Sequence, residues 1–258
     1  MPSLVLSTPA VVVSTRALGE SDLLVTLFTL ETGKLGAVAK GARRSRKRFM
    51  NALEPFTEIS ARLVKSRPSA GLWRLDSALI NNSHESIRTD YLRFTCASLC
   101  LELVDLWQKE GIRDMEVFDL TRWYLAGLAS GAYPVASSLV FKTRLLKAVG
   151  LMPRLSRCRV CGRAPQSTPV GFDRATGEIF CLECGGTAKG GRLGLGTARS
   201  LDFIGRTGLE NVSRLRFTQV QVREGWEYIK QLHCRHLQKE ARSYKLIDLS
   251  KDAHQVQA

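Results

Sequence analysis

Four of the seven cysteines in this 258-residue chain have the spacing of a tetrahedral metal site. Cys158 and Cys161 form one pair, and Cys181 and Cys184 form a second pair after nineteen intervening residues. Two residues between cysteines let both thiolates of a turn face one ion, and two such turns complete a tetrahedron with zinc–sulfur distances of about 2.3 Å. The pattern predicts a structural zinc ion (Zn²⁺), because four thiolates leave no open position for a reactive water.

The remaining cysteines and nearby histidines do not extend this site. Cys96 and Cys100 are one turn apart on the apolar face of a predicted helix, so we expect them in a core. His233, Cys234 and His236 lie within a long predicted helix, and packing is the simpler interpretation of their side chains.

A second chemical feature is the stretch of residues 40–49, called here the basic segment. It contains six cationic residues and no acidic residue: Lys40, Arg43, Arg44, Arg46, Lys47 and Arg48. Such a cluster binds phosphates with release of counterions. Phe49 ends the segment, and core packing and base stacking are equally compatible with its position.

The charge of the whole chain favours a polyanionic partner. Its formal net charge is +14, from 38 lysines and arginines against 24 acidic residues. Further basic residues predict a second basic surface beyond the strands. They are Arg62, Lys65, Arg67 and Arg74, then Arg154, Arg157, Arg159 and Arg163, and finally Arg235, Lys239, Arg242 and Lys245.

Several protein classes are disfavoured by what the sequence lacks. It has no long apolar window for a membrane helix and no signal-peptide pattern, which predicts a cytoplasmic location. It has no Walker A, G-x-S-x-G or H-E-x-x-H motif and no clustered carboxylates. We therefore expect no catalytic residues and no enzymatic activity.

The elements that must position these features change type near residue 82. Before it, five β-rich runs separated by turn signals predict a small closed barrel over residues 1–82. From 83 to 258 the apolar period becomes helical, with a cysteine-bearing insert at 154–190. Helices are predicted near 114–129 and 218–240, and Ser86 is a candidate cap for the helix that carries Cys96 and Cys100. The glycine-rich stretch 185–196 is interpreted as a flexible connector.

The order of these features resembles the bacterial RecO family of recombination mediators. The residues that carry the likeness are Lys40-Gly41-Ala42-Arg43-Arg44, the continuation through Phe49 to Leu53-Glu54-Pro55-Phe56, the cysteine insert, and Arg242-Ser243-Tyr244-Lys245. The resemblance implies an N-terminal OB-fold followed by a helical domain with a zinc-ribbon-like subdomain. It also implies binding of single- and double-stranded DNA and annealing of complementary strands.

The resemblance implies partners and a location as well. RecR and the acidic C-terminal tail of single-strand binding protein would bind the chain directly. RecA would be loaded onto coated DNA during gap repair, in the cytoplasm at the nucleoid. The residues alone leave two other hypotheses open: a nucleic-acid enzyme with a structural zinc, and an RNA-binding transcription or translation accessory factor.

Overall fold

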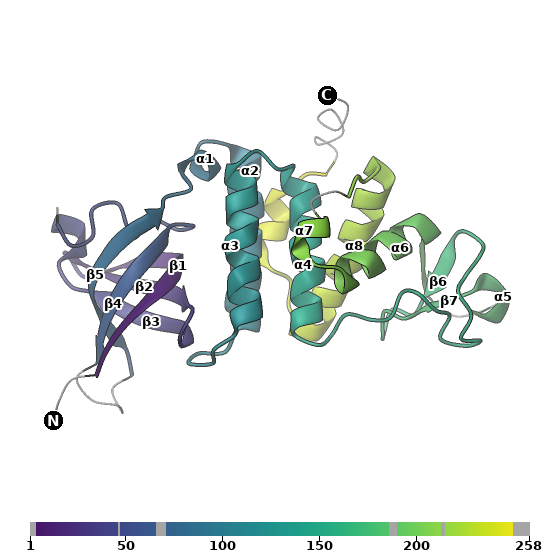
Figure 1. The fold of residues 1–258 in the computed structure, drawn as a ribbon, viewed down its shortest axis with the longest axis horizontal. Helices are drawn as coiled ribbons and strands as arrows, with labels where there is room; N and C mark the ends of the chain where they lie inside the picture. Colours follow the sequence, from purple (N-terminus) through teal and green to yellow (C-terminus); the bar gives the residue numbers. More distant parts are fainter. Residues whose placement is uncertain (1–3, 46, 66–70, 186–189, 213–214, 250–258) are drawn as a thin grey trace. The chain divides into compact units, whose positions relative to one another are not determined.

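The computed structural model describes residues 4–45, 47–65, 71–185, 190–212 and 215–249. The chain divides into two compact units, Met1–Ala132 and Tyr133–Ala258, which are described separately (Figure 1). The domain boundary expected after residue 82 separates strands from helices and lies inside the first unit. That boundary stays a prediction.

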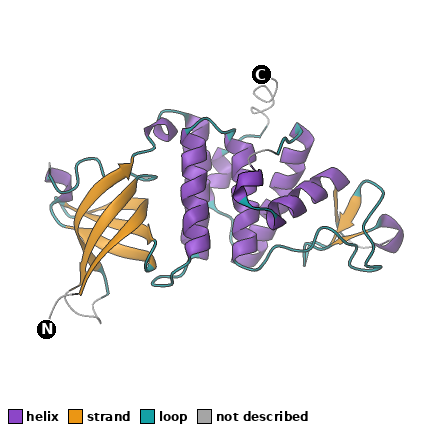
Figure 2. Ribbon diagram, in the orientation of Figure 1, coloured by secondary structure: helices purple, strands orange, loops and turns teal. Residues whose placement is uncertain are grey.

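Five strands of the first unit form a closed barrel (Figure 2). They are β1 (Leu4–Leu18), β2 (Asp22–Thr29), β3 (Gly33–Ala39), β4 (Glu58–Lys65) and β5 (Trp73–Asn82). Their order around the barrel is β1-β2-β3-β5-β4, and every neighbouring pair is antiparallel except β3 and β5. The five predicted strands and the OB-fold barrel are thereby confirmed.

The barrel is filled by alternate side chains, as a closed sheet requires. Leu27, Leu63 and Leu75 are among the residues that point into this core, and each is fully buried. The outer face is also covered where the helices of the unit lie. Phe28 on β2 packs against Phe118 with ring centroids 5.7 Å apart, so that strand is buried on both faces.

The parallel pairing between β3 and β5 is short and leaves part of β5 for another partner. Only Ala37 with Trp73 and Val38 with Arg74 are paired. Farther along β5, the chain between β3 and β4 is hydrogen-bonded to the strand, because Ala78 N–H donates to the Arg48 carbonyl at 3.0 Å. The segment that carries the basic residues is therefore part of the barrel wall.

Three helices complete the first unit: α1 (Glu85–Arg88), α2 (Tyr91–Trp107) and α3 (Met115–Ala129). Asp90 caps α2 by accepting from Arg93 N–H, which satisfies a donor that the helix leaves open. The prediction that Ser86 caps this helix was wrong, because Ser86 lies inside α1. Cys96 and Cys100 are buried on α2, as expected.

A polar network around the buried side chains of Glu58 and His84 connects β4 with α1 and α3. Glu58 binds the His84 ring with Oε1 at 3.0 Å and Arg122 Nε with Oε2 at 2.9 Å. Burial alone would raise the pKa of Glu58, but the bonds to His84 and Arg122 outweigh it and lower the pKa below its ordinary value. The network fixes the start of β4, the strand that follows the basic segment.

The second unit contains helices α4 (Pro134–Ala148), α5 (Leu182–Gly185), α6 (Leu195–Arg206), α7 (Leu209–Val212) and α8 (Gln219–Leu237), followed by the 3-10 turn η2 (Arg242–Leu246). It also has a small sheet of β6 (Val170–Phe172), β7 (Ile179–Phe180) and β8 (Gly191–Leu193), in the order β7-β6-β8. Part of the stretch interpreted as a flexible connector is thus ordered, because Gly191–Leu193 pairs with β6. Residues 186–189 lie outside the described residues, and the stretch ends in α6.

The core of the second unit holds a buried lysine and a buried histidine. Lys142 on α4 is fully buried, with Nζ 3.2 Å from the centroid of the Trp226 ring. His233 on α8 donates from Nε2 to the Lys142 carbonyl at 3.0 Å. Burial lowers the pKa of His233 to about 3, so this ring is neutral at pH 7. The expectation that His233 packs is confirmed.

None of the helices in the described part of the chain combines the length and the hydropathy needed to span a bilayer.

Candidate metal centre and nucleic-acid interface

The cysteine quartet converges in the second unit. The four sulfurs, of Cys158, Cys161, Cys181 and Cys184, all lie within 4.8 Å of one another, and Cys161 and Cys181 are 4.0 Å apart. A tetrahedral ion with sulfur ligands at about 2.3 Å needs sulfurs about 3.8 Å apart. The arrangement therefore fits a metal ion held by four thiolates, as the spacing predicted.

Local turns present the sulfurs from two elements. The first pair lies on a turn closed by Gly162 N–H to the Cys158 carbonyl at 2.9 Å, and Gly162 adopts φ +73°. Arg159 N–H donates to the Ile179 carbonyl at 2.8 Å, which ties this turn to β7. Cys181 directly follows β7, so the small hairpin brings the second pair to the first.

Backbone donors make the Cys158 thiol more acidic than an ordinary cysteine. Its burial would raise the pKa, but amide hydrogens directed at Sγ, including those of Val160 at 3.4 Å and Cys181 at 3.3 Å, lower the pKa to about 6. Burial and the neighbouring sulfurs raise the pKa of Cys181 to about 12. Without a cation, one thiolate is thus stabilised and opposes ionisation of the others, and a divalent cation would remove that opposition.

Phe180 is enclosed beside the cysteines by two glycines. A Cβ added to Gly171 would lie 2.1 Å from Phe180 Cε2, and one added to Gly185 would lie 2.0 Å from Phe180 Cδ2. These approaches exclude any side chain at either position. Phe180 is therefore closely packed against β6 and α5.

The basic segment lies along one end of the barrel in the first unit. Gly41 N–H donates to Asp22 Oδ1 at 2.8 Å, and Arg43 N–H donates to the Ser21 carbonyl at 3.0 Å, which attaches the segment to the β1–β2 turn. The amide of Gly41 is the main cause of the lowered pKa of Asp22. At its other end the segment pairs with β5, as described above.

The predicted cations of this segment are exposed. Lys40, Arg43, Arg44, Lys47 and Arg48 all face solvent, whereas Arg46 lies outside the described residues. Within the described part of the chain, no carboxylate lies within 4.0 Å of these five cationic groups. Arg48 is held in place by Nη2 donating to the Lys40 carbonyl at 2.7 Å. The result is a surface of uncompensated positive charge on a rigid support.

The aromatic residues of this region are buried. Phe49 is 3% exposed in the barrel core beside Ala52 and Leu53, and the Arg48 guanidinium lies 4.9 Å from its ring centroid. Phe56 is 2% exposed. Of the two interpretations of Phe49, the structure therefore favours core packing. Sequence reasoning missed the exposed apolar residue next to it, Met50, at 66% exposure.

The other predicted basic residues divide by partner. Arg159 is bound to Asp173 at 2.7 Å, and Arg62 and Arg74 share Asp76 at 3.6 and 3.7 Å. Arg67 lies outside the described residues. Lys65 is half-buried. The remaining arginines near the cysteines and the late basic residues are exposed: Arg154, Arg157, Arg163, Arg235, Lys239, Arg242 and Lys245.

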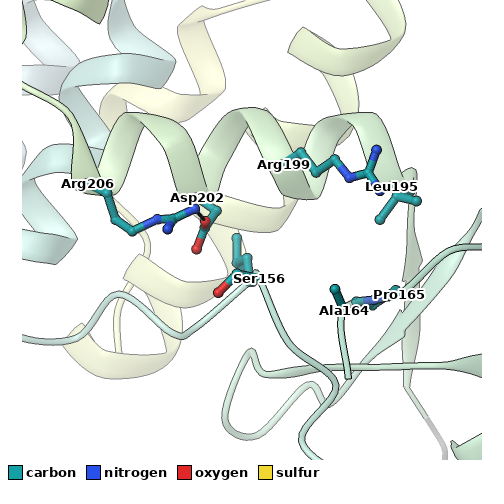
Figure 3. Close-up of a pocket in the computed structure, with 8 residues that line it drawn as sticks. Ser156, Ala164, Pro165, Leu195, Arg199, Asp202 and Arg206 are labelled. Atoms are coloured by element: carbon teal, nitrogen blue, oxygen red, sulfur yellow. Dashed lines mark hydrogen bonds and ion pairs between the residues drawn. The ribbon is translucent and has the colours of Figure 1, made fainter. Parts of the chain in front are cut away.

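A cavity of about 220 Å³ lies in the second unit between α6 and the chain before and after the first cysteine pair. Leu155, Ala164, Pro165 and Leu195 supply apolar wall. Figure 3 shows Arg206 beside Asp202, with which it forms an ion pair, and Arg199 toward the Leu195 end. The cavity thus combines an apolar wall with one exposed arginine, Arg199, that has no ion pair in the described residues.

Comparisons with known proteins agree with this geometry. Residues 1–84 match the family described as Recombination protein O N terminal, and residues 88–245 match Recombination protein O C terminal. The protein named "DNA repair protein RecO" from Desulfosudis oleivorans is 32% identical over 250 residues, covering 93% of this chain and 96% of its own. The protein of the same name from Syntrophus aciditrophicus is 32% identical over 246 residues, covering 93% of this chain and 94% of its own. The one from Myxococcus xanthus is 39% identical over 180 residues, covering 70% of this chain and 72% of its own.

Proposed function

Because this chain belongs to the RecO family of DNA repair proteins, we propose that it binds single- and double-stranded DNA and anneals complementary strands without catalytic turnover. The observation that carries the proposal is the exposed, uncompensated positive charge of the basic segment on the barrel. OB-fold barrels combine such charge with surfaces that accept unstacked bases.

Annealing needs no reacting side chain. Two strands repel each other through their phosphates, and cations fixed on a rigid surface reduce that repulsion while releasing counterions. Arg43, Arg44 and Lys47 are exposed, so they can contact phosphates without losing an intramolecular ion pair. The Watson–Crick edges of the bases stay available for pairing, because these cations contact the backbone.

The proposal includes the partners that the family resemblance implies. The chain would act with RecR and with single-strand binding protein to load RecA onto coated DNA at the nucleoid. For the acidic C-terminal tail of single-strand binding protein, the cavity beside α6 is the candidate site, since Arg199 offers positive charge beside apolar wall. An acidic segment with an apolar end matches both properties.

Zinc is the ion we propose for the cysteine centre. Four thiolates select soft or borderline cations, and zinc accepts a closed tetrahedral set without redox chemistry. Cys158, Cys161, Cys181 and Cys184 would hold it, and the ion would supply only a crosslink between the first turn and the hairpin. Elemental analysis of protein purified under reducing conditions should find about one zinc per chain; a metal-free, folded protein would remove the site from the proposal.

An annealing assay tests the central activity. Complementary strands coated with single-strand binding protein are mixed with the chain in the absence of ATP. We expect faster duplex formation, with acceleration decreasing as salt rises. Duplex formation at the rate of the protein-free control would contradict the proposal, and a clear preference for RNA would favour the accessory-factor alternative.

A further inference from the structure

The outer face of the barrel carries exposed apolar side chains among its arginines, next to the basic segment. Met50 is 66% exposed and Leu79 is 70% exposed, although both lie in stretches whose neighbouring residues enter the core. Phe49 precedes Met50 and Ala78 precedes Leu79, and both preceding residues are buried. The turn thus directs Met50 to solvent, and β5 directs Leu79 to solvent, with Ile80 43% exposed beside it.

Met50 and Leu79 belong to neighbouring parts of one surface. Ala78 N–H donates to the Arg48 carbonyl at 3.0 Å, so the turn that contains Met50 is attached to β5 directly beside Leu79. Asn51 follows with φ +52°, a left-handed conformation in which the chain turns back toward the core. The arrangement keeps Met50 at the outside of the turn.

Arginines continue along the same face. In the register of β4 and β5, Leu79 is opposite Ser60 and Ser77 is opposite Arg62, with Arg74 farther along the strand. The Arg62 and Arg74 side chains are 58% and 53% exposed. One carboxylate, that of Asp76, lies near both, which leaves an excess of positive charge on this face when Arg48 is included.

We propose that Met50 and Leu79 contact the bases of a single DNA strand whose phosphates bind Arg48, Arg62 and Arg74. This inference rests on the proposed function and deepens it by naming the base-contacting residues. Charge complementarity favours a nucleic acid over a neutral protein partner. Apolar side chains beside the cations favour a single strand, because a duplex hides the faces of its bases in the stack.

The test uses the full chain and two strands with the same phosphates. One is an oligothymidine, and the other is an abasic strand of the same length. The double variant Met50→Ser/Leu79→Ser is compared with wild type, and Ile112→Ser is the matched control. Ile112 is 56% exposed in the connection between α2 and α3, so the control makes the same type of change away from the proposed face.

We expect the double variant to bind oligothymidine about tenfold more weakly and to bind the abasic strand as wild type does, since only the base contacts are removed. Ile112→Ser should bind both strands normally. Unchanged oligothymidine binding, or an equal loss for both strands, would overturn the inference. If wild type bound neither strand, the proposed function itself would fail.

Discussion

The cysteine centre and the basic segment are both short stretches rich in one kind of side chain, but they are organised differently. In the cysteine centre, all four characteristic side chains converge on one point, and turns within a few residues of each pair bring them there. In the basic segment, the cations point outward while Phe49, Ala52 and Leu53 fill the barrel. Spacing alone defines the first site. The second depends on the short pairing between β3 and β5, which leaves Ala78 to bind the Arg48 carbonyl.

The two arrangements support different roles. Four convergent thiolates form a closed crosslink that leaves no position for a substrate. The cations of the basic segment are exposed and can bind an external polyanion, and the barrel holds the backbone that carries them. We therefore propose a scaffold role for the cysteines and a DNA-binding role for the barrel surface.

Loss of the metal should have the largest effect. Structural zinc sites contribute about 10–16 kcal/mol in small metal-dependent peptides, so Cys158→Ser should unfold the cysteine-bearing region and lower the melting temperature. Calorimetry with elemental analysis measures both. Cys234→Ser is the control, because Cys234 lies outside the quartet. A Cys158→Ser protein with wild-type stability would contradict the scaffold role.

Truncation of the buried phenylalanine should have the next largest effect. Phe49→Ala should reduce the free energy of unfolding of the first unit by about 3–5 kcal/mol, because it leaves a cavity in the barrel core. Phe49→Leu should cost much less. Denaturant titration measures both variants. If Phe49→Ala kept full stability but lost DNA binding, the stacking interpretation would be restored and the contrast between the regions would be wrong.

The pH dependence of the second unit gives a smaller effect. His233 has a pKa lowered to about 3 by burial, against about 6.5 when unfolded, so its stabilising contribution is complete above pH 6.5 and decreases as the pH falls toward 3. At pH 5 the loss should be about 2 kcal/mol. The contribution of Glu58 decreases only below its ordinary pKa of 4.5, so it does not affect stability between pH 7 and 5.

Thermal melts between pH 7 and 5 follow this loss. His233→Gln keeps a donor for the Lys142 carbonyl but does not titrate, so its stability should change less over the same interval. An equally steep decrease in wild type and variant would show that another group is responsible.

The smallest expected effect concerns the cavity beside α6. Arg199→Glu reverses the charge of an exposed arginine that has no ion pair in the described residues, so it should not affect folding. It should weaken binding of an acidic peptide that ends in an apolar residue by about tenfold, or about 1.4 kcal/mol. Arg235→Glu, an exposed position outside the cavity lining, is the control. Equal losses in both variants would indicate general charge attraction without a specific site.

Much of the fold follows from local patterns in the sequence. The five strands, α3, α8 and the cysteine quartet were predicted because alternation, caps and ligand spacing act over a few residues. The burial of Phe49 was left open because it depends on the short pairing between β3 and β5. The strand β8 was missed because Gly191 has no β-propensity, and only the close approach of Phe172 explains a glycine there.

The exposure of Met50 was equally hidden from the sequence. An apolar residue beside Phe49 suggests two core residues, and only the turn at Asn51 separates an inward from an outward side chain. The exposure of the cations in the basic segment, in contrast, could be predicted from the sequence. Their number and the absence of acids indicated exposure directly, and the structure added only the support that holds them.

The dependence of single-stranded DNA binding on salt tests the central claim most directly. Arg43→Ala, Arg44→Ala and Lys47→Ala are combined in one variant, and the slope of log affinity against log salt is compared with wild type. Each phosphate contact to a single strand contributes about 0.7 to that slope, so we expect the slope to decrease by about 2 while the melting temperature is unchanged. An unchanged slope would contradict the assignment of DNA binding to the basic segment.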